Sequence, residues 1–245
     1  MQILGSLIFN LYFVLSTALW SLVVAFAGFF LSYERRFELV RSWARSVTHC
    51  LEMCCGLSYD VEGAEHFDGP AAVILQKHSS AWETVAGIVY CPAHTWVLKR
   101  ELMWVPILNL ALIAMRVIPI NRKGRRSAVA QVIEHGTNRL GDGINVMIYP
   151  EGTRVAPGQN GRFGRSGAKL AVSAGVPVIP VAHNAGEFWG RNQHIKSRGT
   201  IRVVIGPPIP TLGRDPDDVT REAAEWLDVT MARISDAHAS IAVTP

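Results

Sequence analysis

The sequence lacks the residue patterns of several common functional sites. Its cysteines, Cys50, Cys54, Cys55 and Cys91, form no C-x-x-C pair and have no histidine at zinc-binding spacing, which argues against a metal centre. There is no G-x-S-x-G turn and no evident cysteine nucleophile. An enzyme built on this chain would therefore activate a hydroxyl of its substrate rather than a side chain of its own. The segment NRKGRR is not a Walker A loop, which disfavours nucleotide binding of that kind.

Charge is absent from the start of the chain. Residues 1–33 contain no Asp, Glu, Lys, Arg or His, and this run exceeds the ~20 apolar residues that a bilayer-spanning helix needs. We expect a membrane helix rather than a buried core helix. A secretory signal is a further alternative, because Ala25-Phe26-Ala27 resembles a cleavage site. However, the run lacks a basic n-region and is longer than a usual hydrophobic region of about 7–15 residues, so we expect it to stay in the mature protein.

The segment that follows is basic and amphipathic. Arg35 and Arg36 come directly after the apolar run, and the positive-inside tendency places them, with the rest of the chain, on the cytoplasmic face of the inner membrane. Over residues 37–55 apolar side chains recur at steps of three and four, which predicts a helix that ends near Gly56. We interpret residues 1–57 as a membrane-anchoring helical hairpin that either spans the bilayer or rests in one leaflet.

Residues 58–245 are predicted to form an α/β domain, because short apolar runs alternate with helical stretches. The runs predicted to be strands are 71–75, 96–98, 116–120, 145–149, 176–182 and 200–206. The predicted helices are 81–89, 125–140, 166–174 and 216–234. Pro119 and Pro180 suit an edge strand or a strand end, since proline cannot donate a hydrogen bond to a ladder.

Polar side chains follow four of the predicted strands at the point where each strand ends. They are Lys77 and His78, Lys99 and Arg100, Asn121 to Lys123, and Glu151 to Arg154. Ligands of open α/β sheets bind at the carboxyl ends of strands, so these groups predict one site for an anionic substrate. Arg122 and Arg154 offer planar donors suited to phosphate, and Lys99 adds a further charge. The alternative is that each segment is only a polar loop.

The net charge of +4 also permits a nucleic-acid partner. The basic residues are scattered and have no aromatic residues between them. We therefore expect no nucleic acid to bind.

His78 and Glu83 are the candidate catalytic pair. On a regular helix, five residues correspond to a rotation of about 500°, which would keep the two side chains apart. They meet only if His78 precedes the helix, and Ser79 and Ser80 are suitable residues for such a helix start. Ser80-Ala81-Trp82-Glu83 is equally a capping box, in which Glu83 would only bond the cap amide. The spacing leaves both roles open: a carboxylate that orients a histidine base, or a helix cap.

Four ordered blocks over about residues 70–206 resemble the glycerolipid acyltransferase family, most closely the bacterial lysophosphatidic acid acyltransferases. The His-x-x-x-x-Asp block of the family is matched by His78 to Glu83, with an acid that is one methylene longer. VIPINR, with Arg122, matches the second block. Glu151, Gly152, Thr153 and Arg154 match the third, E-G-T-R, which in the family belongs to the phosphate site for the acyl acceptor. VPVIPVA matches the fourth, a channel wall, and Lys99 resembles another basic residue of the acceptor pocket.

The resemblance implies a mixed or mostly parallel sheet flanked by helices, and an enzyme of phospholipid biosynthesis at a lipid bilayer. Such an enzyme would move a fatty acyl group from acyl-CoA or acyl carrier protein to the sn-2 hydroxyl of lysophosphatidic acid, giving phosphatidic acid. It implies that His78 is the general base, that Glu83 is the orienting acid, and that amides near the helix start hold the oxyanion. No metal or prosthetic group is required.

Two alternative functions remain from the residues alone. One is an acyltransferase for another acceptor, such as glycerol 3-phosphate, a lysophospholipid or a lyso-aminolipid. The other is a basic membrane-binding protein without catalysis, in which Glu83 would be only a cap.

Overall fold

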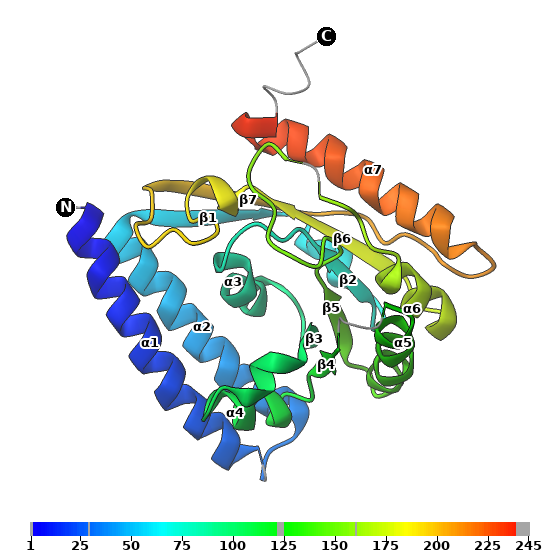
Figure 1. Ribbon diagram of the computed structural model, residues 1–245, viewed down its shortest axis with the longest axis horizontal. Coiled ribbons are helices and arrows are strands. Elements are labelled where there is room, and N and C mark those ends of the chain that lie inside the picture. Colours follow the sequence, from blue (N-terminus) through cyan, green and yellow to red (C-terminus); the bar gives the residue numbers. More distant parts are fainter. Residues whose placement is uncertain (1, 29, 122–124, 160, 239–245) are drawn as a thin grey trace.

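A seven-stranded sheet forms the centre of the structure (Figure 1). The computed structural model describes residues 2–28, 30–121, 125–159 and 161–238. The strands are β1 Leu57–Glu62, β2 Val73–Gln76, β3 His94–Lys99, β4 Ile118–Ile120, β5 Asn145–Ile148, β6 Val178–His183 and β7 Gly199–Ile205. They lie in the order β1-β7-β6-β2-β5-β3-β4. All neighbours are parallel except β6 and β7, which confirms the predicted mixed, mostly parallel sheet.

Helices cover both faces of this sheet. The α-helices are α1 Gln2–Ala27, α2 Tyr33–Cys55, α3 Trp82–Tyr90, α4 Leu108–Ala114, α5 Arg125–Gly141, α6 Ser166–Ala174 and α7 Pro216–Ile234. Short 3-10 helices are η1 Ala64–Phe67, η2 Arg100–Trp104 and η3 Ala185–Glu187. Figure 1 shows α5, α6 and α7 on one side, and α1 to α4 on the other.

Alternate residues of the central strands belong to different cores. Ile74 and Met147 pack with residues of α1, α2 and α3, whereas Val73, Leu75 and Val146 pack with residues of α5, α6 and α7. Strands that are covered on both faces are apolar at every position. This is why β2, β5 and β6 could be recognised as continuous apolar runs.

The sequence did not predict β1 and α4. The apolar residues of β1 alternate with Ser58, Asp60 and Glu62, and the strand lies at the edge of the sheet with a half-exposed surface. It therefore has no continuous apolar run. α4 lies in the uncharged stretch 102–115, which has no polar face to reveal a helical period.

The two prolines differ in their positions. Pro119 lies in the edge strand β4, as expected, but the expectation of an edge or strand end is wrong for Pro180, which lies within the interior strand β6. The antiparallel ladder between β6 and β7 begins only at Val181. The carbonyl of Pro180 still accepts a hydrogen bond from Gly206 N at 2.8 Å. The position at which Pro180 lacks an N–H therefore lies just outside the ladder between β6 and β7.

The two N-terminal helices form an antiparallel hairpin that packs on the α/β domain. Tyr12 Oη donates to Ser46 Oγ at 2.9 Å across the hairpin. α1 is long and apolar enough to cross a membrane, by length and composition. Gly56, in the left-handed conformation with φ 64°, ends α2 and is the one residue between α2 and β1. The predicted second helix is confirmed and begins at Tyr33, while the division of the chain at residue 57 stays a prediction.

We expect Gly5→Ala to lower thermal stability, because α1 and α2 touch at this glycine. A Cβ atom at position 5 would lie 1.9 Å from the carbonyl oxygen of Cys54, so the helices would have to separate. Overpacking of this kind costs roughly 1–3 kcal/mol. Thermal unfolding in detergent would show a lower Tm. Gly69→Ala is the matched control, since its Cβ meets nothing within 4 Å; equal Tm values for the two variants would contradict the prediction.

Candidate active site

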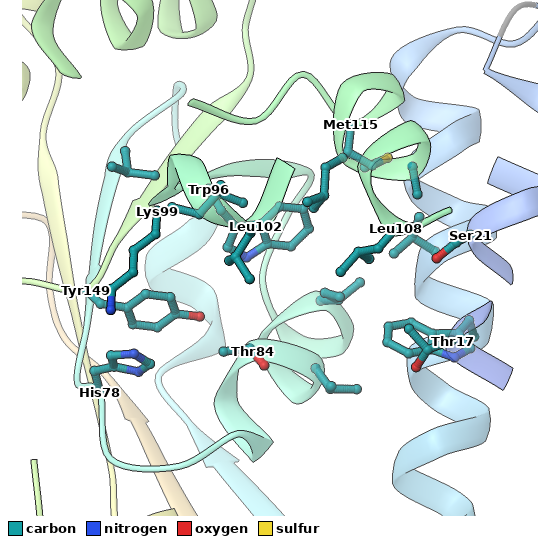
Figure 2. Close-up of a pocket in the computed structure, with 18 of the residues that line it drawn as sticks. Thr17, Ser21, His78, Thr84, Trp96, Lys99, Leu102, Leu108, Met115 and Tyr149 are labelled. Atoms are coloured by element: carbon teal, nitrogen blue, oxygen red, sulfur yellow. The ribbon is translucent and has the colours of Figure 1, made fainter. Parts of the chain in front are cut away.

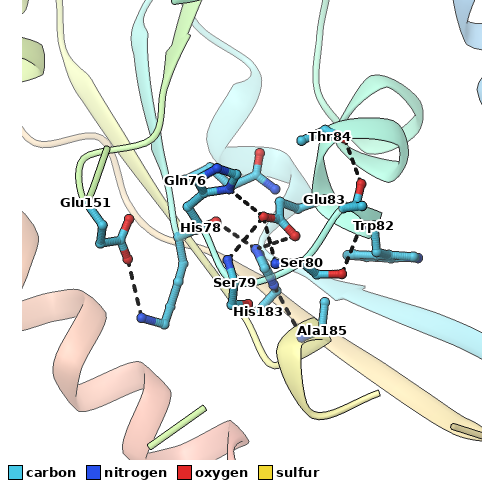
Figure 3. Close-up of polar contacts among 12 residues, drawn as sticks. Gln76, His78, Ser79, Ser80, Trp82, Glu83, Thr84, Glu151, His183 and Ala185 are labelled. Carbon is cyan, nitrogen blue, oxygen red and sulfur yellow. Dashed lines mark hydrogen bonds and ion pairs between the residues drawn. The ribbon is translucent and has the colours of Figure 1, made fainter. Parts of the chain in front are cut away.

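His78 and Glu83 are in direct contact, as Figure 3 shows. His78 lies in the loop after β2, and Glu83 lies in the first turn of α3. His78 Nδ1 is 2.7 Å from Glu83 Oε1. When Nδ1–H donates to this carboxylate, the ring is held in one tautomer and Nε2 is left to accept a proton from a bound molecule.

The same carboxylate oxygen also caps α3. Glu83 Oε1 accepts hydrogen bonds from Ser79 N at 3.1 Å and from Ser80 N at 3.0 Å. Ser80 Oγ in turn accepts from Trp82 N at 3.0 Å. The orienting contact and the cap, which spacing left as alternatives, therefore exist together. The amides of Ser79, Ser80 and Trp82 bond within this turn, so the expectation of oxyanion donors at the helix start does not hold for these three.

Glu83 is fully buried. Burial raises the pKa of its carboxyl, but the hydrogen bond from His78, the neighbouring imidazoles and the Ser80 amide outweigh burial and bring the pKa below its usual value. The carboxyl is ionised at neutral pH. The hydrogen bond from His78 is therefore charge-assisted, which makes it stronger than a bond between neutral groups.

His183 is a buried neighbour of this pair that the sequence did not identify. It ends β6, beside β2, and its Nε2 lies 2.8 Å from the carbonyl oxygen of Lys77 and 3.9 Å from Glu83 Oε2. Its Nδ1 lies 3.3 Å from Ala185 N. Burial lowers the pKa of His183, so the ring is neutral, with Nε2–H donating to Lys77. The sequence carries a signal for it: His183 directly follows an apolar run, and His78 likewise comes shortly after one.

Tyr149 supports His78 from the other side. It directly follows β5, and its ring stacks on the imidazole with centroids 4.3 Å apart and planes 23° apart. In the same loop, Val155 N donates to His78 O at 2.8 Å. The sequence pattern places Tyr149 only at the end of the predicted strand 145–149. Its place two residues before the EGTR segment, at the end of an apolar run, is the signal that the sequence offers.

A cavity of about 530 Å³ opens beside His78 and reaches the N-terminal helices. Figure 2 shows His78, Lys99 and Tyr149 at one end, and Thr17, Ser21 and Leu108 at the other. The polar and charged side of its lining includes His78, Lys99, Tyr149, Gly152, Thr153 and Arg154, and Arg191 also lines the cavity. The apolar part includes Val24, Trp43, Val85, Ile88, Leu108 and Leu112. These two ends suit an amphiphilic ligand with an anionic head and an apolar chain.

The structure brings together four of the predicted substrate-binding residues. Lys99, Gly152, Thr153 and Arg154 line the cavity. Gly152 adopts φ 68°, a left-handed conformation that favours glycine, in the turn after Tyr149. Arg122 lies outside the described residues.

Glu151 does not line the cavity and instead pairs with Lys77. Lys77 Nζ lies 3.3 Å from Glu151 Oε1, and the side chains are only 8% and 5% exposed. Burial raises the pKa of Glu151, and the Lys77 charge offsets this only in part. The pair joins the strand end that carries His78 to the EGTR loop. Glu151 is thus placed to position this loop rather than to touch a ligand.

Comparisons with known proteins agree with this geometry. The family profile described as acyltransferase matches residues 58–184. The chain is 37% identical over 238 residues to the 1-acyl-sn-glycerol-3-phosphate acyltransferase of Pseudomonas aeruginosa, covering 96% of this chain and 93% of that protein. It is 32% identical over 167 residues to the human 1-acyl-sn-glycerol-3-phosphate acyltransferase alpha, and the match covers 67% of this chain and 59% of that longer protein.

A solved structure shows the same fold. The crystal structure of the 1-acyl-sn-glycerophosphate acyltransferase PlsC from Thermotoga maritima superposes with a TM-score of 0.79. The sequences are 18% identical, and the match covers 96% of this chain and 97% of that one.

We expect Glu151→Gln to lower the free energy of unfolding by about 3–5 kcal/mol, because Lys77 would be left buried without its carboxylate. The double variant Lys77→Met, Glu151→Leu removes both charges and should recover much of the loss. Denaturant unfolding of Lys77→Met, of Glu151→Leu and of the double variant measures the coupling between the two side chains. Strictly additive losses would contradict the ion pair.

Proposed function

Because this chain belongs to the acyltransferase family, we propose that it transfers a fatty acyl group from a thioester to the sn-2 hydroxyl of lysophosphatidic acid, giving phosphatidic acid. The donor is acyl-CoA or acyl carrier protein. The observation that carries the proposal is the oriented His78, which opens into a cavity that is cationic at one end and apolar at the other. The names of the relatives from Pseudomonas and human support the same acceptor.

His78 acts as general base in this mechanism. Its Nδ1–H stays bonded to the ionised Glu83, while Nε2 takes the proton of the acceptor hydroxyl as that oxygen attacks the thioester carbonyl carbon. The C–O bond forms, the C–S bond breaks, and the imidazolium returns the proton to the leaving thiolate. General base catalysis of this kind contributes about 10²–10⁴-fold in rate. No acyl-enzyme, metal or prosthetic group takes part.

The two ends of the cavity bind different parts of the substrates. Arg154 and Lys99 bind the phosphate of the acceptor, with Arg154 supplying a planar, bidentate donor. The apolar walls from α1, α2 and α4 bind an acyl chain. An amphiphile held in this way presents its free hydroxyl beside His78.

The hairpin binds the cytoplasmic face of the inner membrane. Both parts of the hairpin are tied to the α/β domain: Gln2 Nε2 donates to Lys196 O at 2.6 Å, and Arg36 Nη1 donates to Ala114 O at 2.8 Å. Since α1 lies along a domain that carries charge, it rests in one leaflet rather than crossing the bilayer.

Exposed apolar side chains of α1 and of the η2–α4 segment form the lipid-facing surface. In α1 they are Ile3, Leu4, Leu7, Ile8, Leu11, Val14, Leu15, Leu19, Leu22, Val23 and Phe26. In the η2–α4 segment they are Leu102, Trp104, Val105, Ile107, Leu110 and Ile113. An apolar surface of this extent on a free-standing soluble protein would be unusual.

We expect His78→Ala to lower kcat for phosphatidic acid formation by about 10²–10⁴-fold, because the general base is lost. The assay uses purified protein in detergent with acyl-CoA or acyl carrier protein donors. Its acceptor panel includes lysophosphatidic acid, glycerol 3-phosphate and other lysolipids. His135→Ala, an exposed histidine on α5, is the control. Full activity of His78→Ala would exclude this mechanism.

Glu83→Gln separates the orienting role from the cap. The amide oxygen of glutamine still accepts from Ser79 and Ser80, but the residue loses the charge that stabilises the imidazolium. We therefore expect a fall in kcat of at least about 10²-fold with a nearly unchanged Tm. A lower Tm with unchanged kcat would assign Glu83 to capping alone.

Arg154→Ala should chiefly weaken acceptor binding. Loss of a charge-assisted hydrogen bond to phosphate costs about 1.5–3 kcal/mol, or roughly 10–100-fold in the KM for lysophosphatidic acid. The control is Arg162→Ala, an exposed arginine in the same loop that does not line the cavity. An unchanged acceptor KM would exclude the phosphate contact.

A further inference from the structure

Arg191 is a cation of the cavity that belongs to none of the sequence blocks. It lies in the segment between η3 and β7, is exposed, and lines the same cavity as His78. No acidic side chain pairs with Arg191 among the salt bridges of the described residues. Its guanidinium is therefore available to an anionic ligand.

Arg191 reaches the cavity from the side of His78 opposite to Arg154. The sheet order places β2 between β5 and β6. On the β5 side, Val155, next to Arg154, bonds to His78 through the backbone at 2.8 Å. On the β6 side, Gly190, next to Arg191, forms an antiparallel bridge with Ser80.

Arg154 and Arg191 are thus each one residue away, along the chain, from a backbone contact with the segment that carries His78. Lys99 follows β3, the next strand beyond β5. The cavity therefore has two cationic sites, Arg154 with Lys99 on one side and Arg191 on the other.

The proposed reaction needs two anion sites. The acceptor carries a phosphate, and the thioester donor carries phosphates of its own, whether it is acyl-CoA or acyl carrier protein. The two substrates must approach Nε2 of His78 together, so their charged parts have to lie apart to avoid repulsion.

We infer that Arg191 binds a phosphate of the thioester donor while Arg154 and Lys99 hold the acceptor. This assignment rests on the proposed function. It makes Arg191 a residue that recognises the donor, with no part in proton transfer.

The test compares donors that are shortened stepwise from the adenosine end and lose their phosphates in turn, at saturating lysophosphatidic acid. The donors are acyl-CoA, acyl-3′-dephospho-CoA, acyl-4′-phosphopantetheine and acyl-pantetheine, which has no phosphate. We expect Arg191→Ala to raise the KM for acyl-CoA roughly tenfold or more. The KM for acyl-pantetheine and for lysophosphatidic acid should stay unchanged.

The truncated donors identify the phosphate that Arg191 contacts. If Arg191→Ala also raises the KM for acyl-4′-phosphopantetheine, Arg191 contacts the pantetheine phosphate. If the KM rises only for acyl-CoA and acyl-3′-dephospho-CoA, Arg191 contacts a phosphate nearer the adenosine. Both results support the inference.

Matched variants separate charge from structure. Arg191→Lys keeps a cation and should recover part of the donor affinity, whereas Arg191→Gln should not. Arg198→Ala, an exposed arginine of the same segment that does not line the cavity, should leave both KM values unchanged.

Three results would overturn the assignment: unchanged donor KM values, an equal loss with acyl-pantetheine, or a rise in the acceptor KM. If the wild-type protein acylates no acceptor with any donor, the proposed function fails first. That result is recognised before any Arg191 variant is measured.

Discussion

One oxygen of Glu83 accepts hydrogen bonds from His78 Nδ1, Ser79 N and Ser80 N, and the site depends on this shared contact. The start of α3 and the orientation of the imidazole are consequently set by the same atom. A carboxylate buried this completely would be unfavourable in isolation. Its three donors and the nearby His183 compensate for the burial and keep it charged.

The segment that carries His78 is also fixed by both neighbouring loops. After β5, Tyr149 stacks on the ring and Val155 bonds to the His78 carbonyl. After β6, His183 bonds to the Lys77 carbonyl. These contacts come from strands adjacent to β2, so the parallel arrangement of the sheet is what gathers them. Rigid support of this kind lets a catalytic group keep its geometry without help from the substrate.

Much of the fold could be predicted because the central strands are apolar on both faces and the helices have clear ends. α6 and α7 have the predicted bounds, and α7 begins at Asp215 and Pro216 as expected. β1 was not predicted from the sequence, because an edge strand needs an apolar residue only at alternate positions. The prediction for Pro180 was wrong because a proline is tolerated in an interior strand when its missing N–H lies beyond the ladder with the neighbouring strand. Where the β6–β7 ladder begins depends on the register of the two strands, which the sequence of one strand does not reveal.

Residues of the candidate site could be predicted where charged side chains directly follow a predicted strand and belong to one of the blocks that resemble the family. His78, Lys99 and the EGTR loop were found in this way, and four predicted binding residues share one cavity. The partner of Glu151 was not predictable, because Lys77 lies far from it in the chain and belongs to another strand end. Tyr149 and His183 lie at the ends of apolar runs in the sequence, but their contacts with the His78 segment are tertiary and leave no spacing pattern.

The short link at Gly56 has a mechanical consequence. With one residue between α2 and β1, and β1 bonded along its length to β7, no flexible linker separates the hairpin from the sheet. In the proposed membrane-bound state, the hairpin holds His78 at a constant depth relative to the lipid headgroups. The domain has no tether on which to swing out and collect its acceptor. Under the proposed function, lateral diffusion of the lipid acceptor, rather than movement of the protein, brings the acceptor to His78.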